Sequence, residues 1–298
     1  MFGRMKLMAL GLAAALATVA AAVGASGAGS ASVPTCLGEK ATIVGTPGDD
    51  VITGTRNDDV IVSLEGNDTI DARDGDDLIC AGDGNDSING GDGFVSGIDG
   101  GAGDDTIDGG NATFALALYV DSNEPVSADL AAGTATGAGT DKLIDINGVV
   151  GSRGSDVLAG DQGLNLIYGG SGNDVIRGGA GPDMLSGEDG LDRLDGGPGL
   201  DEVSYYEAPR RVVVDLVAGT ARGWGTDTLS HIEQIDGSRY ADTLRGNGRA
   251  NWIEGEGGRD VIIGRSGNDH LIGGAARDVA DGGSGRDACA AERKIRCP

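Results

Sequence analysis

A period of nine residues runs through most of this chain. Read from Gly45, the sequence divides into GTPGDDVIT, GTRNDDVIV, SLEGNDTID, ARDGDDLIC and AGDGNDSIN. The phase passes through one longer, irregular unit at 90–99 into GGAGDDTID at 100–108, and it returns for six units at 151–204 and six more at 237–290. Most of these eighteen units have glycine at positions 1 and 4, aspartate at position 6 and an aliphatic residue at position 8. A disordered glycine-rich linker would not keep this spacing.

Each nine-residue unit combines a turn with a short strand. The glycines suit a backbone that turns sharply or adopts positive φ, and positions 7–9 form a strand whose middle side chain points to one face. Two units make one coil, and coils stacked ~4.8 Å apart pair their strands in parallel and enclose the aliphatic residues. The pattern therefore predicts an all-β fold, a parallel β-roll or β-helix solenoid, with the position-8 residues as its core.

In such a solenoid, position-6 aspartates that are 18 residues apart lie one above another, separated by about 5 Å. Carboxylates at this spacing repel one another unless a cation lies between them. Together with the carbonyl groups of the turns they form an oxygen-only cage, which suits Ca²⁺ better than Mg²⁺. Aspartate is also common in ordinary turns, but its recurrence in phase favours calcium binding. The expected metal ligands are Asp50, Asp59, Asp68, Asp77, Asp86, Asp105, Asp156, Asp174, Asp183, Asp192, Asp201, Asp242, Asp260, Asp269, Asp278 and Asp287.

A longer repeat is superimposed on the short one. Residues 119–201 match 205–287 at a constant offset of 86, so the second half of the chain is a tandem duplication. We expect an N-terminal arm at 26–44, a first repeat array at 45–111, a second module at 112–204, its duplicate at 205–290 and a C-terminal disulfide cap at 291–298. Each duplicated module consists of a strand-rich lead followed by six nonapeptides.

The composition explains why such a chain needs a cation. It contains 57 glycines and 47 acidic against 22 basic residues, and its net charge is −25. Ordering glycine costs entropy, and like charges repel in any compact state, so the chain is expected to be disordered without bound cations. The same acidity argues against nucleic acid and anionic membrane surfaces as partners.

The first 25 residues have the layout of a secretory signal peptide. Arg4 and Lys6 precede an apolar run at 7–23, and small residues follow it. An N-terminal membrane anchor is the alternative, although the apolar run is at the short limit for a membrane span. We therefore expect a secreted, extracellular protein that has no contact with the membrane after cleavage.

Four cysteines remain in the exported chain, and an even number outside the cell favours disulfide bonds. Three pairings are possible. The simplest joins Cys36 to Cys80 and Cys289 to Cys297, because each bond would then hold one end of an elongated stack. A zinc site is disfavoured because the sequence contains no C-x₂₋₄-C pair.

The nine-residue unit resembles the haemolysin-type, or RTX, calcium-binding nonapeptide, and the resemblance covers nearly all of residues 45–290. It implies that position-6 aspartates of repeats n and n+2 share each Ca²⁺ with backbone carbonyls. Some positions depart from the pattern. Asn165 and Asn251 replace the aspartate, which implies weaker sites, and Val95 falls in the irregular unit. Ala280 and Cys289 replace the inner aliphatic residue, which suggests a capped end.

No catalytic motif accompanies the repeats. The sequence contains neither H-E-x-x-H nor G-x-S-x-G, and no segment outside the repeats is long enough for a separate catalytic domain. We therefore expect a calcium-dependent structural or interaction module and no enzyme, whose partners are Ca²⁺ ions and a cell-surface polysaccharide or another surface protein. Two alternatives stay open: a carbohydrate-binding module that uses Trp224, Tyr240 and Trp252, and an enzyme that acts through carboxylates on the solenoid face.

Overall fold

The computed structural model describes residues 33–137 and 139–297, so the segment expected to be a signal peptide lies outside the described residues. Within the described ranges every regular element is a β-strand, and no helix is long and apolar enough to span a membrane. The chain forms two compact units. Unit 1 contains residues up to Leu118 together with Gly133–Ile146, and unit 2 contains Tyr119–Ala132 and Asn147–Pro298.

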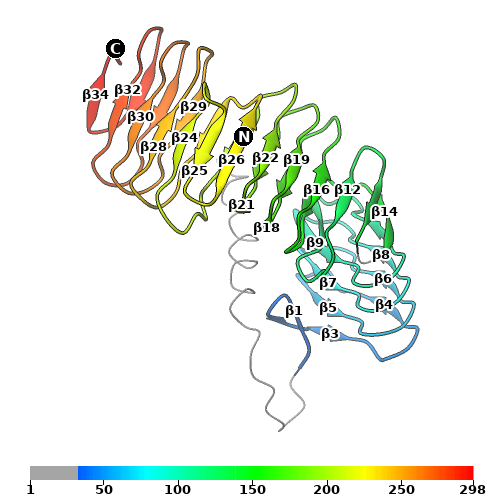
Figure 1. Ribbon diagram of the computed structural model, residues 1–298. Helices are drawn as coiled ribbons and strands as arrows, with labels where there is room; N and C mark the ends of the chain where they lie inside the picture. The colour runs from blue at the N-terminus through cyan, green and yellow to red at the C-terminus, as the bar shows by residue number, and fades with distance from the viewer. Residues whose placement is uncertain (1–32, 138, 298) are drawn as a thin grey trace. The chain divides into compact units, whose positions relative to one another are not determined.

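Unit 1 is a solenoid of short parallel strands that alternate between two sheets, as Figure 1 shows in colours from blue to the green of β14. Sheet 1A contains β4 (Val51–Thr53), β6 (Thr69–Asp71), β8 (Ser87–Asn89), β10 (Thr106–Asp108) and β14 (Thr140–Ile144), with β13 (Thr134–Thr136) antiparallel to β14. Sheet 1B contains β3 (Ile43–Val44), β5 (Val60–Val62), β7 (Leu78–Cys80), β9 (Val95–Asp99) and β11 (Phe114–Leu118). A hairpin of β1 (Thr35–Cys36) and β2 (Glu39–Lys40) precedes them.

Unit 2 has the same alternation. Sheet 2A contains, in spatial order, β12 (Ser127–Asp129), β16 (Val157–Ala159), β19 (Val175–Arg177), β22 (Arg193–Asp195), β26 (Thr226–Ser230), β25 (Thr220–Arg222), β24 (Val213–Asp215), β28 (Thr243–Arg245), β30 (Val261–Ile263), β32 (Val279–Asp281) and β34 (Arg293–Ile295). Sheet 2B contains β15 (Gly148–Val150), β17 (Leu166–Tyr168), β20 (Met184–Ser186), β23 (Glu202–Ser204), β27 (Gln234–Asp236), β29 (Trp252–Glu254), β31 (His270–Ile272) and β33 (Ala288–Ala290). β18 (Ser171–Gly172) and β21 (Asp189–Gly190) pair within the turns.

The core of each unit is the ladder of position-8 side chains. Ile70 pairs in register with Ile52 and Ile88, and Ile176 with Leu158 and Leu194. These side chains are at most 8% exposed, because both sheets turn their position-8 residues inward. A register of 18 residues follows directly from two nonapeptides per coil, so the sequence prediction of a parallel β-roll is confirmed.

The irregular unit at 90–99 absorbs its extra residue without breaking the ladder. β9 is five residues long, and Ile98 takes the inner place opposite Ile79. The backbone amides of Phe94 and Val95 both donate to the carboxylate of Asp76, at 2.8 and 3.1 Å. Gly97 lies opposite Leu78, and its amide donates to the carbonyl of Asp77, so Ser96 takes the place of the position-6 aspartate and Val95 is the extra residue.

A junction, residues 205–236, separates the two nonapeptide arrays of unit 2. In sheet 2B, β23 pairs directly with β27, so the stack advances by one strand. In sheet 2A the chain inserts an antiparallel meander, and the order becomes β22, β26, β25, β24, β28. Sheet 2A thus has two more strands than sheet 2B at this point, which lengthens it by roughly 10 Å at about 4.8 Å per strand.

Candidate calcium sites in the turns

The position-6 aspartates lie inside the turns and not on their surface. Fifteen of the sixteen predicted ligands are at most 6% exposed, and Asp50 is half-buried. An ionised carboxylate is costly to bury unless hydrogen bonds or a cation compensate for the lost water. The turns must therefore supply partners for both carboxylate oxygens.

One oxygen of each aspartate has such a partner. The backbone amide of a position-6 residue donates to Oδ1 of the aspartate two repeats later, with N–O distances of 2.7–3.0 Å. The aspartates linked in this way are Asp50 to Asp68, Asp59 to Asp77, Asp68 to Asp86, Asp86 to Asp105, Asp156 to Asp174, Asp174 to Asp192, Asp183 to Asp201, Asp242 to Asp260, Asp260 to Asp278 and Asp269 to Asp287. The nine pairs that the sequence places one above another are all in this set.

The other oxygen, Oδ2, is orphaned in twelve of these aspartates. It is buried and has no hydrogen-bond partner among the described residues in Asp68, Asp77, Asp86, Asp105, Asp174, Asp183, Asp192, Asp201, Asp260, Asp269, Asp278 and Asp287. A single buried polar group left unsatisfied costs about 1–3 kcal/mol. Twelve oxygens orphaned in the same way call for a common partner, and a cation can satisfy a row of carboxylates at once.

Backbone carbonyls face the same spaces as these oxygens. A Cβ added to Gly169 would lie 2.9 Å from the carbonyl oxygen of Gly187 and close to Oδ2 of Asp174. A side chain at Gly169 would therefore lie in the space between these two oxygens. Carboxylate and carbonyl oxygens that converge in this way are hard ligands, which suit Ca²⁺. The residues present thus fit a calcium ion.

Burial and mutual repulsion raise the pKa values of several of these aspartates. Desolvation is the largest cause and the neighbouring carboxylates add to it, so that the pKa of Asp105, Asp174, Asp183, Asp192 and Asp260 rises from 3.8 to about 7. The backbone hydrogen bond to Oδ1 opposes the shift only in part. Without a cation these five carboxyl groups are therefore about half protonated near pH 7.

The position-6 residue that begins each row of stacked turns has a different hydrogen-bond partner. In Asp50, Asp59, Asp156 and Asp242, Oδ2 accepts the backbone amide of the residue four positions earlier, at 2.6–2.7 Å. Asn165 and Asn251 belong to the same class: the Oδ1 atom of each accepts that amide at 2.8 Å. Their Nδ2 groups donate to the carbonyls of Asn147 at 3.4 Å and Glu233 at 3.1 Å.

Sequence reasoning did not select three buried carboxylates that extend these rows beyond the nonapeptides. Asp105 donates its amide to Oδ1 of Asp141 at 3.1 Å, and Asp192 does so to Asp227 at 3.3 Å. Asp201 donates to Oε2 of Glu233 at 3.3 Å. A signal was present for the first two, because GTDKLI and GTDTLS reproduce the end of a nonapeptide, G-x-D-x-L-x. Glu233 carries no such signal.

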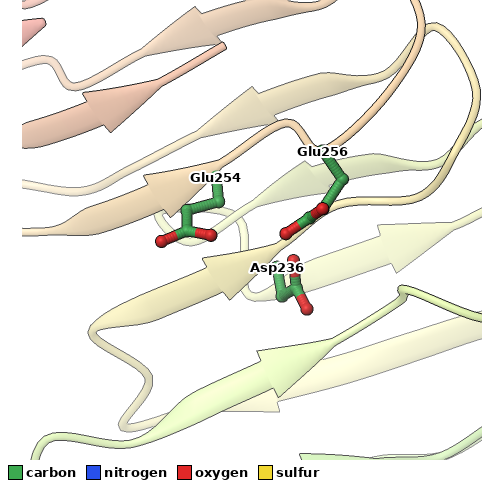
Figure 2. Close-up of side chains that lie close together, drawn as sticks. All are labelled: Asp236, Glu254 and Glu256. Atoms are coloured by element: carbon green, nitrogen blue, oxygen red, sulfur yellow. The ribbon is translucent and has the colours of Figure 1, made fainter. Parts of the chain in front are cut away.

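A further carboxylate cluster lies on sheet 2B. Asp236 at the end of β27, Glu254 at the end of β29 and Glu256 in the next turn bring carboxylate oxygens within 4.8 Å of one another. Figure 2 shows the three side chains close together. Asp236 is 2% exposed, and its Oδ2 accepts a hydrogen bond from the Ser204 hydroxyl at 3.3 Å. A cation at this place would reduce the repulsion among the three carboxylates.

The aromatic residues considered for sugar binding are not gathered into one stack. Trp252 is 43% exposed and stacks on His270, with ring centroids 4.0 Å apart. Its indole N–H donates to Glu254 at 2.7 Å. Tyr240 is 47% exposed. Trp252 thus has a ring partner and a hydrogen bond within its own sheet.

Both disulfide bonds join the pairs that the sequence favours. Cys36 in β1 is bonded to Cys80 at the end of β7 in unit 1. Cys289 in β33 is bonded to Cys297 in unit 2. Each bond fixes a segment that lies outside the nonapeptides to the neighbouring repeats.

A comparison with protein families agrees with this geometry. The model of the RTX calcium-binding nonapeptide repeat matches residues 41–70, 63–94, 98–112, 150–185, 168–203, 236–271 and 257–289. These segments cover more than half of the chain and include the turns that hold the orphaned oxygens. No curated protein sequence matches the chain. The chain belongs to the family of proteins with RTX calcium-binding nonapeptide repeats, a family whose repeats bind Ca²⁺.

Proposed function

We propose that this protein is an extracellular structural or interaction module that folds when Ca²⁺ enters its turns after export. The sixteen position-6 aspartates named above are the proposed ligands, together with the carbonyls of the position-1 residues. The observation that carries the proposal is the set of twelve buried Oδ2 atoms without a hydrogen-bond partner among the described residues.

Charge balance supports calcium as the folding switch. The net charge of the chain is −25, and one Ca²⁺ for each orphaned oxygen would bring about +24, which removes most of the self-repulsion. Each site stabilises the folded state by about 1.4 kcal/mol when Ca²⁺ is tenfold above its Kd. Extracellular calcium sites often bind at about 10⁻⁴–10⁻³ M, so the chain would stay unfolded in the cytosol and fold outside the cell.

Secretion is supported by two features. The apolar segment at 7–23 with its basic start has the composition of a signal peptide, and two disulfide bonds suit an oxidising compartment. We further propose that binding, not catalysis, is the activity of this module. The partner class would be a cell-surface polysaccharide or another surface protein, engaged once calcium has ordered the solenoid.

Far-UV circular dichroism and small-angle scattering of the chain without residues 1–25 test the folding step. In EDTA we expect an expanded chain with little strand signal, and in 5–10 mM Ca²⁺, roughly ten times the usual constants, a compact strand-rich form. Mg²⁺ at the same concentration is the control and should not substitute. A compact, strand-rich protein in EDTA with the disulfide bonds reduced would refute the proposal.

A pull-down from a native cell surface in millimolar Ca²⁺, together with a glycan array, then identifies the class of partner.

A further inference from the structure

The segment after the last nonapeptide, residues 291–297, follows the pattern of a repeat although its sequence does not. Its strand β34 pairs with β32 in parallel, with Arg293 opposite Val279. The amide of Arg293 donates to the carbonyl of Asp278 at 3.1 Å, just as the amide of Val279 donates to that of Asp260 at 2.9 Å. We call residues 291–297 the cap segment.

Glu292 occupies the place of a position-6 aspartate in this segment. The amide of Asp278 donates to Oε2 of Glu292 at 2.8 Å, which reproduces the bond from the amide of Asp260 to Asp278 at 3.0 Å. Glu292 follows Asp278 by 14 residues, whereas neighbouring aspartates of a row are 18 apart. The turn is therefore shorter, and the longer glutamate side chain reaches the same amide.

The carbonyl of Arg296 takes the place of a position-1 carbonyl in the row of turns that ends with Asp287. A Cβ on Gly282 would lie 2.6 Å from Oδ2 of Asp287 and 2.7 Å from the Arg296 carbonyl oxygen. One coil earlier, a Cβ on Gly264 would face Oδ2 of Asp269 and the carbonyl of Gly282, the latter at 2.8 Å. Arg296 itself adopts a left-handed φ of 45°.

Both aspartates that meet the cap segment have an orphaned oxygen. Asp278 is 1% and Asp287 is 6% exposed, and the Oδ2 atom of each has no hydrogen-bond partner among the described residues. These two unsatisfied oxygens indicate a bound cation, whatever the role of the cap segment. The cap segment places one further potential ligand oxygen beside each aspartate: the Glu292 carboxylate beside Asp278 and the Arg296 carbonyl beside Asp287.

Two links hold the cap segment against the stack. The disulfide bond between Cys289 and Cys297 fixes the residue that follows Arg296. The guanidinium group of Arg296 pairs with the carboxylate of Asp281, with Nε donating to Oδ1 at 2.7 Å. Both links lie next to the Arg296 carbonyl and hold this part of the cap segment against the last repeats.

We propose that the cap segment acts as a final calcium-binding repeat, in which the Glu292 carboxylate and the Arg296 carbonyl supply ligands to the Ca²⁺ ions held by Asp278 and Asp287. The Cys289–Cys297 bond keeps these ligands in place, so that the last two sites bind Ca²⁺ more weakly in the reduced protein. The inference rests on the proposed calcium binding of the repeats and extends it to residues outside them.

Hydrogen exchange followed by mass spectrometry during a calcium titration resolves these sites from the others. In the oxidised protein, peptides covering 273–297 should gain protection with Ca²⁺. Glu292→Gln keeps the shape and the disulfide bond but removes a ligand charge, and it should raise the calcium midpoint of 273–281 by about tenfold. The Cys289→Ser/Cys297→Ser protein should raise the midpoints of both 273–281 and 282–290. Peptides within 151–204 should not change in either variant.

Two matched variants separate calcium ligation from a mechanical role. Lys294→Gln alters an exposed charge in the same cap segment, and Cys36→Ser/Cys80→Ser removes the other disulfide bond. Neither should move the midpoint of 273–290. If Glu292→Gln shifts no midpoint, or Lys294→Gln shifts it equally, the ligand role of Glu292 is refuted. If no peptide of the unaltered protein responds to Ca²⁺, the proposed function itself has failed, which is a different result.

Discussion

The arrays and the junction of unit 2 stack aspartates in the same way but satisfy them differently. In the array at 237–290, Asp260 and Asp278 bury an Oδ2 atom that has no hydrogen-bond partner among the described residues. In the junction, Asp227 accepts the amide of Asp192 through Oδ1, as an array aspartate would, while its Oδ2 accepts the hydroxyl of Tyr205 at 2.8 Å. A stacked carboxylate can thus be stabilised by a cation or by a buried hydroxyl, and only the first depends on the calcium concentration.

The electrostatics of the junction agree with this comparison. Tyr205 is 1% exposed, and burial together with the charge of Asp227 raises the pKa of its hydroxyl well above the usual value of 10. The hydroxyl therefore keeps its proton and remains a donor. Burial raises the pKa of Asp227 to about 6, with the Tyr205 hydrogen bond opposing the shift, whereas that of Asp192 next to it rises to about 7.

Calcium removal should produce the largest difference between the two regions. As chelator is added, exchange protection should disappear first from the arrays at 151–204 and 237–290 and last from the junction at 205–236. The reason is that each array turn loses about 1.4 kcal/mol or more with its ion, while the Tyr205–Asp227 bond is unaffected. Hydrogen exchange resolved by peptide measures the order, and simultaneous loss from all three segments would contradict the comparison.

Acidification should have the next largest effect. The folded pKa of about 7 for Asp174, Asp183 and Asp260 lies above the unfolded value of 3.8. These groups therefore bind more protons when folded, and the stability of the calcium-free fold falls as the pH rises from about 4 to about 7. Calcium affinity changes in the opposite direction, because Ca²⁺ needs the ionised carboxylate.

Between pH 7.5 and 5.5 we accordingly expect the sites of Asp174, Asp183 and Asp260 to lose roughly tenfold or more in calcium affinity. Isothermal titration calorimetry at the two pH values measures the change, and proton release on calcium binding near pH 7 provides an internal check. Affinity that stays constant over this range would mean that the aspartates are already ionised in the calcium-free protein.

Replacement of the junction hydroxyl should have a smaller effect. Tyr205→Phe leaves Oδ2 of Asp227 buried without a donor, which costs about 1–3 kcal/mol. Urea denaturation in just-saturating Ca²⁺ measures this loss, and excess Ca²⁺ should reduce it if the cation can replace the hydroxyl. Tyr240→Phe is the control, because Tyr240 is 47% exposed. Equal stability of the Tyr205→Phe and unaltered proteins would show that the hydrogen bond contributes little.

The smallest effect should come from replacing the asparagine at the beginning of a row with the aspartate that the repeats usually have at this position. Asn251→Asp replaces the amide that donates to the Glu233 carbonyl at 3.1 Å with a carboxylate oxygen. Two oxygens then face each other, as in the arrays, and calcium affinity should rise by up to about tenfold at one site. Asn165→Asp provides the parallel test with a longer contact of 3.4 Å. A calcium titration in which both variants bind equally or more weakly than the parent would oppose this interpretation.

The period of nine was sufficient to predict which side chains face inward and which aspartates stack. Ile70 lies between Ile52 and Ile88 because every coil has the same length. Asp68 meets the amide of Asp50 for the same reason. What the repeat could not predict is which oxygen of each carboxylate already has a partner, because Asp156 and Asp174 occupy the same position in their units. Only Asp174 has an orphaned Oδ2.

By itself, then, the sequence determined the parallel β-roll, its two-unit coil, its inner ladder and its calcium chemistry, since each of these follows from a local pattern repeated in phase. Only the tertiary structure decided where the rows continue beyond the repeats. Asp227, Glu233 and Glu292 reach the rows from segments 35, 32 and 14 residues away from the amides that they accept, and Tyr205 reaches Asp227 from the other end of the junction. Contacts of this kind depend on how an antiparallel meander or a shortened turn folds back, and no period in the sequence encodes that distance.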